Sequence, residues 1–239
     1  MAKRETLFKT EVDLCAAFLE WLKRYPEWTA YAETEGWDIL LAHRDGTQIG
    51  IQAKLSFNMK VLEQAIECGG GWQTIGPDYR AVLVPEDTGV QFVCDALGLV
   101  LISAGRRYRG MPSGTPVEFI PAFDEQNWTR WHYHNPEKRH QLPRYIPDVQ
   151  AGAASPCVLT KWKIAALEIC AVIELRGHVT RADFKRAGVD HRRWIESWLE
   201  PALGVPGAWT WKKDQGPLFQ QAHEKVYPQV LADVRARFL

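Results

Sequence analysis

Apolar and polar positions repeat at two different periods along the first half of the chain. Segments with apolar residues at helical spacing alternate with shorter apolar runs of strand length. The order is a helix, three strands, a helix, a strand, a helix and a strand, which predicts an α/β sandwich with a mixed sheet flanked by helices. The clearest of these segments are a helix opening at Thr10, a helix within 56–67, a strand at 79–85, a helix at 90–97 and a strand at 97–103.

Two of the predicted strands form a hairpin with polar residues at its open end. A turn at Arg44-Asp45-Gly46 separates Asp38 from the segment Gln52-Ala53-Lys54. A two-residue turn would pair Asp38 with Ala53, whereas a one-residue bulge would pair it with Gln52. Gln52 and Lys54 are two residues apart and are expected on one strand face. Polar groups are costly among apolar neighbours unless they bind something, so this end of the hairpin predicts a binding site.

The residue types at this end suit a metal ion and a phosphate. Carboxylate and amide oxygens are hard ligands that Mg²⁺ accepts, and an adjacent lysine can orient a water molecule or stabilise charge on a phosphate. Asp38 and Gln52-Ala53-Lys54 resemble the motif of the PD-(D/E)xK nuclease superfamily, whose fold is restriction-endonuclease-like. Gln52 stands where that pattern has an acid, which removes one negative charge. The resemblance implies a nuclease that uses Mg²⁺ or Mn²⁺, held by Asp38, Gln52 and Glu11.

Three further residues complete the candidate catalytic set. Glu11 opens the first helix, and in the resembled family a first-helix glutamate points at the metal; an ordinary first-turn acid favoured by the helix dipole is the alternative. Glu33 could take that place near the metal or be a solvated residue at a strand end. Gln64 resembles a glutamine that several nuclease subfamilies carry close to the active site, on the helix after the lysine strand. Its alternative role is part of a solvated helix face.

The second half of the chain shows helical patterns followed by a hairpin pattern. A long amphipathic helix ends at Gly177, a capping box at Thr180-Arg-Ala-Asp183 opens a short helix, and Asp190 caps a third helix through Leu199. A hairpin at 207–216 and a closing helix at 226–238 follow. This order resembles the winged helix-turn-helix, which binds DNA and in other proteins mediates protein contacts. The resemblance implies DNA contacts by the basic residues Arg192 and Arg193, Lys212 and Lys213, and Arg181 and Lys185.

Residues 126–157 separate the two patterned halves. They are rich in proline, aromatic and basic residues and poor in periodicity, which predicts a linker or an extended arm. The arm could contact nucleic acid or pack over the sheet, and its histidines at 132, 134 and 140 are expected at the surface or in stacking contacts rather than on a metal. The domain prediction is therefore a nuclease-like domain at 1–125, this linker, and a winged-helix-like domain at 158–239.

The charge distribution adds to the functional hypothesis. The chain of 239 residues has zero net charge, but residues 1–125 hold 12 Lys and Arg against 18 Asp and Glu, and residues 126–239 hold 17 against 11. The basic half is thus expected to supply much of the attraction for phosphate. Five scattered cysteines indicate neither a zinc finger nor a disulfide framework. No apolar run approaches the ~20 residues of a membrane span, so a cytoplasmic protein without a membrane partner is expected.

Two functions are consistent with these patterns. The first is a metal-dependent phosphodiesterase that acts on duplex or branched DNA and recognises it through the winged helix. The second is a catalytically weak or inactive nuclease fold that serves as a DNA- or protein-binding module, for example in a phage or mobile element.

Overall fold

The computed structural model describes residues 8–67, 75–86, 89–105, 116–123, 131–154, 157–213, 216–217 and 219–237. The chain divides into two compact units. The sheet unit comprises Met1–Leu142 and Val149–Pro156, and the helical unit comprises Pro143–Asp148 and Cys157–Leu239. Within the described ranges, no helix is long and apolar enough to cross a membrane.

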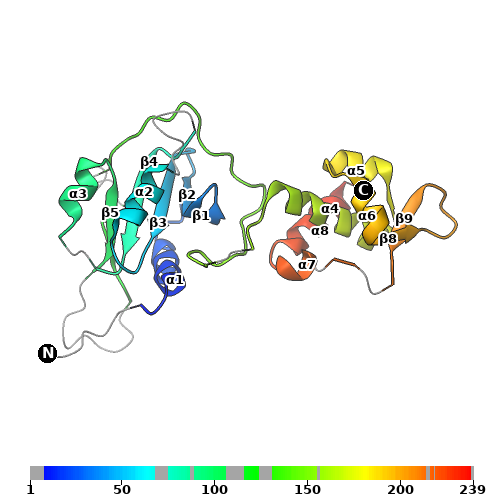
Figure 1. Ribbon diagram of the computed structural model, residues 1–239, viewed down its shortest axis with the longest axis horizontal. Coiled ribbons are helices and arrows are strands. Elements are labelled where there is room, and N and C mark those ends of the chain that lie inside the picture. Colours follow the sequence, from blue (N-terminus) through cyan, green and yellow to red (C-terminus); the bar gives the residue numbers. More distant parts are fainter. Residues whose placement is uncertain are drawn as a thin grey trace. The chain divides into compact units, whose positions relative to one another are not determined.

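The sheet unit is an α/β structure built on one six-stranded mixed sheet (Figure 1). Its strands lie in sequence order from β1 to β6; the first three pair antiparallel, β3, β4 and β5 pair parallel, and β6 pairs antiparallel with β5. The strands are β1 (Trp28–Thr34), β2 (Trp37–His43), β3 (Gln48–Ala53), β4 (Tyr79–Val84), β5 (Val100–Ala104) and β6 (Phe119–Ile120). The helices are α1 (Glu11–Leu22), α2 (Met59–Glu67) and α3 (Gln91–Ala96). The prediction of a mixed sheet flanked by helices is confirmed, and its order of elements is the observed order up to β5.

Two cores lie on the two faces of this sheet. Ile39 and Ile51 belong to the core that contains the buried side of α1, and Leu40 belongs to the core that contains the buried side of α2. A Cβ atom at Gly50 would come within 2.3 Å of the Trp37 ring, so only glycine leaves room for that indole against the strand. Because both faces are covered, the central strands are continuous apolar runs rather than alternating ones.

The β2–β3 hairpin has the bulged register. His43 and Thr47 close a three-residue turn, in which Gly46 has φ +90°. The turn needs a glycine there, as three-residue hairpin loops commonly do. The paired residues then run back along the strands to Ile39 and Ile51, so the next position places Asp38 opposite Gln52. The two-residue turn, which would have paired Asp38 with Ala53, is therefore not the one that forms.

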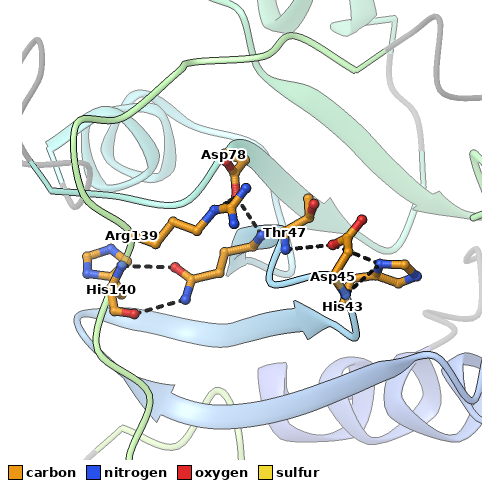
Figure 2. A network of polar contacts seen from close by, with 7 residues as sticks. His43, Asp45, Thr47, Asp78, Arg139 and His140 are labelled. Carbon is orange, nitrogen blue, oxygen red and sulfur yellow. Dashed lines mark hydrogen bonds and ion pairs between the residues drawn. The ribbon is translucent and has the colours of Figure 1, made fainter.

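The segment 131–142 packs on the sheet unit instead of extending from it. Trp131 is 7% exposed and belongs to the α1-side core. Arg139 Nε donates to the buried Asp78 carboxylate (2.7 Å), which also accepts the Gln48 N–H, and the Gln48 side chain exchanges two hydrogen bonds with the backbone of His140 (Figure 2). The expectation that His140 lies at the surface is wrong, because its ring is buried and accepts a hydrogen bond from the Trp37 indole.

In its described residues the helical unit has five helices and a small antiparallel sheet in the order β7-β9-β8 (Figure 1). The elements are α4 (Lys161–Arg176), β7 (Val179–Thr180), α5 (Arg181–Ala187), α6 (His191–Ser197), β8 (Leu199–Pro201), β9 (Ala208–Trp211), α7 (Phe219–Ala222) and α8 (Tyr227–Ala236). The predicted caps are observed: Gly177 is left-handed at the end of α4, Thr180 and Asp183 form a capping box, and Asp190 caps α6.

The hairpin of this unit lies earlier in the chain than predicted. Its strands pair Leu199 with Trp211 and Pro201 with Trp209, so residues 202–207 form the turn. Gly207, which the pattern suggests as the beginning of the hairpin, instead ends this turn with φ +74°. The predicted third helix stops at Ser197, because Leu199 is drawn into the sheet and the core.

Candidate active site

Asp38 is held at the open end of the β2–β3 hairpin. Its Oδ2 atom accepts the Ala53 N–H at 2.7 Å, so the carboxylate takes a place that a strand carbonyl would otherwise fill. Within the described residues Asp38 Oδ1 makes no hydrogen bond. One oxygen is thus used to fix the side chain, and the other is available to a ligand.

Lys54 and Glu11 form an ion pair beside this carboxylate. Lys54 follows the last residue of β3, and its Nζ lies 2.7 Å from Glu11 Oε2, with the two side chains 21% and 31% exposed. Glu11 is the first residue of α1, whose position is set by the Thr10–Asp13 capping box and by the buried face that packs on the sheet. The structure therefore brings together Glu11 and Lys54 as the sequence hypothesis requires.

Glu33 joins the same cluster from β1. The pairs Ala32–Ile39 and Thr34–Trp37 flank it, so its place in the register is opposite Asp38. Its φ of +47° is left-handed, which is strained for a glutamate and locally distorts the strand. Its Oε1 atom accepts the Gly152 N–H at 2.7 Å. Glu33 is thus held in place by a backbone segment far along the chain and is not a freely solvated strand end.

Gly152 is a residue of this site that the sequence did not reveal. Its φ is +75°, and a Cβ atom there would lie 3.1 Å from both the Cys15 sulfur and the Glu11 carbonyl oxygen. Only glycine combines this conformation with such a close approach. The sequence around Gly152 has the composition of a linker, so no local signal could have placed it beside two acids.

Two acids of the cluster have pKa values above their usual range. Burial raises the pKa of Asp38 above its usual range, and the nearby Glu11 charge adds to this effect. Burial also raises the pKa of Glu33, with the Asp38 charge as the second cause. Lys54 and backbone N–H groups act in the opposite direction without cancelling the rise. The buried thiol of Cys15 also has a raised pKa, from burial first and then from the same three acids.

The two predicted amide residues lie on the other side of this arrangement. Gln52 is 2% exposed, and its Nε2 donates to the Gly36 carbonyl at 2.8 Å. Its neighbours Ile51 and Ala53 belong to the α1-side core, so strand alternation directs Gln52 to the opposite face. Gln64 is on α2, and its Oε1 atom is buried without a hydrogen-bond partner.

The donor chemistry of the cluster fits a divalent cation, but the arrangement is not a closed metal site. Three carboxylates, those of Glu11, Glu33 and Asp38, raise the pKa of one another or of Cys15 and share one lysine. Such an excess of buried negative charge is relieved by a hard cation. Across the described ranges, however, no three His, Cys, Asp or Glu side chains are placed to hold a metal together.

The candidate DNA-binding residues fall into two groups. Arg192, Arg193 and Lys185 are exposed, the two arginines at the start of α6. Others already have partners within the unit: Lys212 Nζ donates to the Glu196 carbonyl at 2.6 Å, and Arg181 lies 5.7 Å from the centre of the Trp209 ring. Lys213, exposed beyond the end of β9, belongs with the first group. Residues of this group are therefore better placed to contact a ligand than Lys212 and Arg181.

Comparisons of this chain with protein families, curated proteins and solved structures found no match.

Proposed function

We propose that the protein is a metal-dependent phosphodiesterase that cuts DNA, with the restriction-endonuclease-like arrangement that its motif resembles. The observation that carries this proposal is the cluster around Lys54, in which Glu11 pairs with the lysine and the pKa values of Asp38 and Glu33 are raised. Several acids beside a single lysine are more typical of a site that binds a cation and a phosphate than of a purely structural contact.

In this proposal the carboxylates of Asp38, Glu11 and Glu33 would hold Mg²⁺ or Mn²⁺, without Gln52, which β3 directs to the opposite face of the sheet. An ion held there would polarise the phosphate and supply hydroxide at neutral pH. Lys54, whose Nζ lies 2.7 Å from Glu11, would orient the attacking water and stabilise charge on the phosphate. The Ala53 N–H, which donates to Asp38, fixes this carboxylate at the site.

The helical unit is proposed to bind the DNA. Its order of α4, β7, α5, α6, β8 and β9, with the sheet order β7-β9-β8, is typical of a winged helix. Under this proposal α6 is the recognition helix, and the turn at 202–207 is the wing, with Leu203 99% exposed at its tip. Arg192 and Arg193 would then contact phosphates from the exposed start of α6.

A plasmid-nicking assay tests the catalytic part of the proposal. The full chain is incubated with supercoiled DNA in Mg²⁺, in Mn²⁺ and in excess EDTA. We expect cutting with either ion and none with EDTA. Absence of cutting with both ions, by protein that binds DNA, would contradict the enzyme proposal.

A gel-shift titration at several salt concentrations tests the DNA-binding part. Reversing the charge of Arg192 and Arg193 should weaken binding to all sequences and flatten the salt slope by roughly one unit per lost phosphate contact. Reversal of Arg235, a basic residue of the last turn of α8, is a control for net charge. Equal slopes for the wild type and the Arg192/Arg193 variant would direct the search toward a protein partner.

The second candidate function is a binding module without catalysis. It is favoured by one observation, namely that no group of three metal-binding side chains is preformed in the described part of the chain. The Glu11–Lys54 ion pair would then be a structural contact between α1 and β3. DNA binding without metal-dependent cutting in the two assays would select this function.

A further inference from the structure

A cysteine, a histidine and an aspartate form a connected series in the helical unit. Asp148 Oδ1 lies 2.9 Å from His223 Nδ1, and His223 Nε2 lies 3.9 Å from the Cys157 sulfur. The side chains of His223 and Asp148 are 1% and 6% exposed, whereas Cys157 is exposed. The series therefore runs from the interior of the unit to a thiol at its surface.

Asp148 determines which ring nitrogen of His223 can accept the proton of the Cys157 thiol. The carboxylate accepts the His223 Nδ1–H and, through Oδ2, the Lys225 N–H at 3.0 Å. Burial acts to raise the pKa of Asp148, but these hydrogen bonds outweigh it and hold the pKa below its usual range. An ionised carboxylate on Nδ1 keeps the proton there and leaves Nε2 as the acceptor directed at Cys157.

A lysine approaches the same sulfur from α4. Lys163 Nζ lies 3.1 Å from the Cys157 sulfur, and the Lys163 backbone N–H is capped by Thr160, which fixes this first turn of the helix next to the cysteine. An ammonium group and an imidazole therefore lie beside one exposed sulfur, where the imidazole can accept the thiol proton as the sulfur attacks. Cys170 differs in kind, since burial raises its pKa to about 12. Cys15 and Cys94 are buried as well.

We propose that Cys157 is a reactive thiol that forms a mixed disulfide with small disulfides, of which glutathione disulfide is the test case. His223 Nε2 takes the thiol proton, and the Cys157 sulfur attacks one sulfur of the reagent. A new S–S bond forms as the reagent's S–S bond breaks. The leaving thiolate carries away the bonding electron pair and accepts the proton from His223, so Cys157 is oxidised and half of the reagent is reduced to a thiol. This reaction uses none of the residues of the carboxylate cluster.

The rate of glutathionylation measures the proposal directly. The full chain is incubated with glutathione disulfide at pH 7, and the adduct on each cysteine is followed by peptide mass mapping. We expect Cys157 to react about tenfold faster in the folded chain than in the same chain unfolded in urea, because folding places the Lys163 ammonium and the His223 imidazole beside its sulfur. Cys15, Cys94 and Cys170 should react only after unfolding. Equal rates for Cys157 in the folded and unfolded chain would overturn the proposal.

Two variants show whether the neighbouring side chains are responsible. Lys163→Met and His223→Gln should each slow the reaction of Cys157 roughly fivefold or more, while Lys163→Arg should keep most of the rate. Arg235→Met, which removes an exposed basic residue from the last turn of α8, is the control for net charge. If the buried His223→Gln variant does not fold, Lys163→Met decides. A folded Lys163→Met protein that reacts as fast as the wild type would overturn the proposal.

Discussion

Two acids of the sheet unit, Asp38 and Glu33, and two of the helical unit, Asp148 and Asp183, have pKa values shifted in opposite directions. In the sheet unit the pKa values of Asp38 and Glu33 are raised, because burial penalises their charge and neighbouring acids add to the penalty. In the helical unit burial acts in the same direction on Asp148 and Asp183, yet their pKa values are lowered, because hydrogen bonds outweigh it. Burial alone therefore does not distinguish the two pairs.

What distinguishes them is the number of donors around each acid. Asp183 Oδ2 accepts hydrogen bonds from the Arg176 guanidinium and from both the N–H and the hydroxyl of Thr180, so this acid has three donors, one of them charged. In the sheet unit Lys54 acts on Glu11, Glu33 and Asp38 together. A satisfied acid stabilises a fold, whereas acids that lack positive charge are available to an external cation.

The largest expected effect is on cleavage. Asp38→Ala and Lys54→Ala should each reduce DNA cutting roughly 10³-fold or more, since each removes a group that acts on the metal or the phosphate in the transition state. Lys60→Ala, at an exposed position of α2, is the matched control and should cut like the wild type. Plasmid nicking with purified protein measures the loss. Full activity in both site variants would refute the assignment of the cluster as an active site.

The next largest effect is on the free energy of unfolding and concerns Asp183. Asp183→Ala should lower the free energy of unfolding of the helical unit by about 3 kcal/mol, because it removes the Arg176–Asp183 ion pair and breaks the Thr180 capping box. Asp38→Ala should change the stability of the sheet unit by only about 1 kcal/mol, since the lost Ala53 hydrogen bond is offset by removal of a poorly balanced charge. Urea unfolding followed by peptide-level hydrogen exchange assigns each change to its unit. An equal loss of unfolding free energy in the two variants would show that the additional donors around Asp183 do not make it more stabilising than Asp38.

A smaller effect is expected from Gln52→Glu. The substitution removes the N–H donor to the Gly36 carbonyl and buries a charge on the face of β3 opposite the cluster, so it should cost about 1–3 kcal/mol of stability. Mn²⁺ bound at the carboxylate cluster should stabilise the wild type and the variant alike, by about 2.7 kcal/mol when its concentration is 100 times the dissociation constant. Thermal unfolding with and without Mn²⁺ measures both quantities. A larger stabilisation by Mn²⁺ in Gln52→Glu than in the wild type would place this side chain in the metal site.

The smallest effect is the pH response of these acids. Because the folded pKa values of Asp38 and Glu33 are raised, their protonation as the pH falls from 7 toward about 4 should stabilise the sheet unit, whereas the lowered pKa values of His134 and His140 act against it in the same range. Asp148 and Asp183 have lowered pKa values, so their contribution is complete above about pH 4 and is lost as the pH falls below it. Urea unfolding of the wild type and of Asp38→Asn at pH 7 and pH 5 isolates the contribution of Asp38, and the wild type should gain stability relative to the variant as the pH falls. A difference between the two proteins that does not change with pH would contradict this prediction.

The sequence by itself determined the local elements of both units. Helix starts at Thr10, Thr180 and Asp190 and the helix end at Gly177 were predictable, because capping depends on residues within one turn of each other. The buried strands were predictable from their continuous apolar runs. The sequence also limited the strand partner of Asp38 to Ala53 or Gln52, but the choice between these two registers depends on the length of the turn at Gly46.

Only the tertiary structure decided which distant residues meet. The hydrogen bond between Glu33 and Gly152 joins residues 119 positions apart, and the contact between Cys157 and His223 joins residues 66 positions apart. A linker-like segment gives no local sign of such contacts, because the chain folds it against partners that lie in other elements. The same holds for the balance of each acid: the residue type is written in the sequence, but the pKa depends on the burial and the donors that the folded chain places around it.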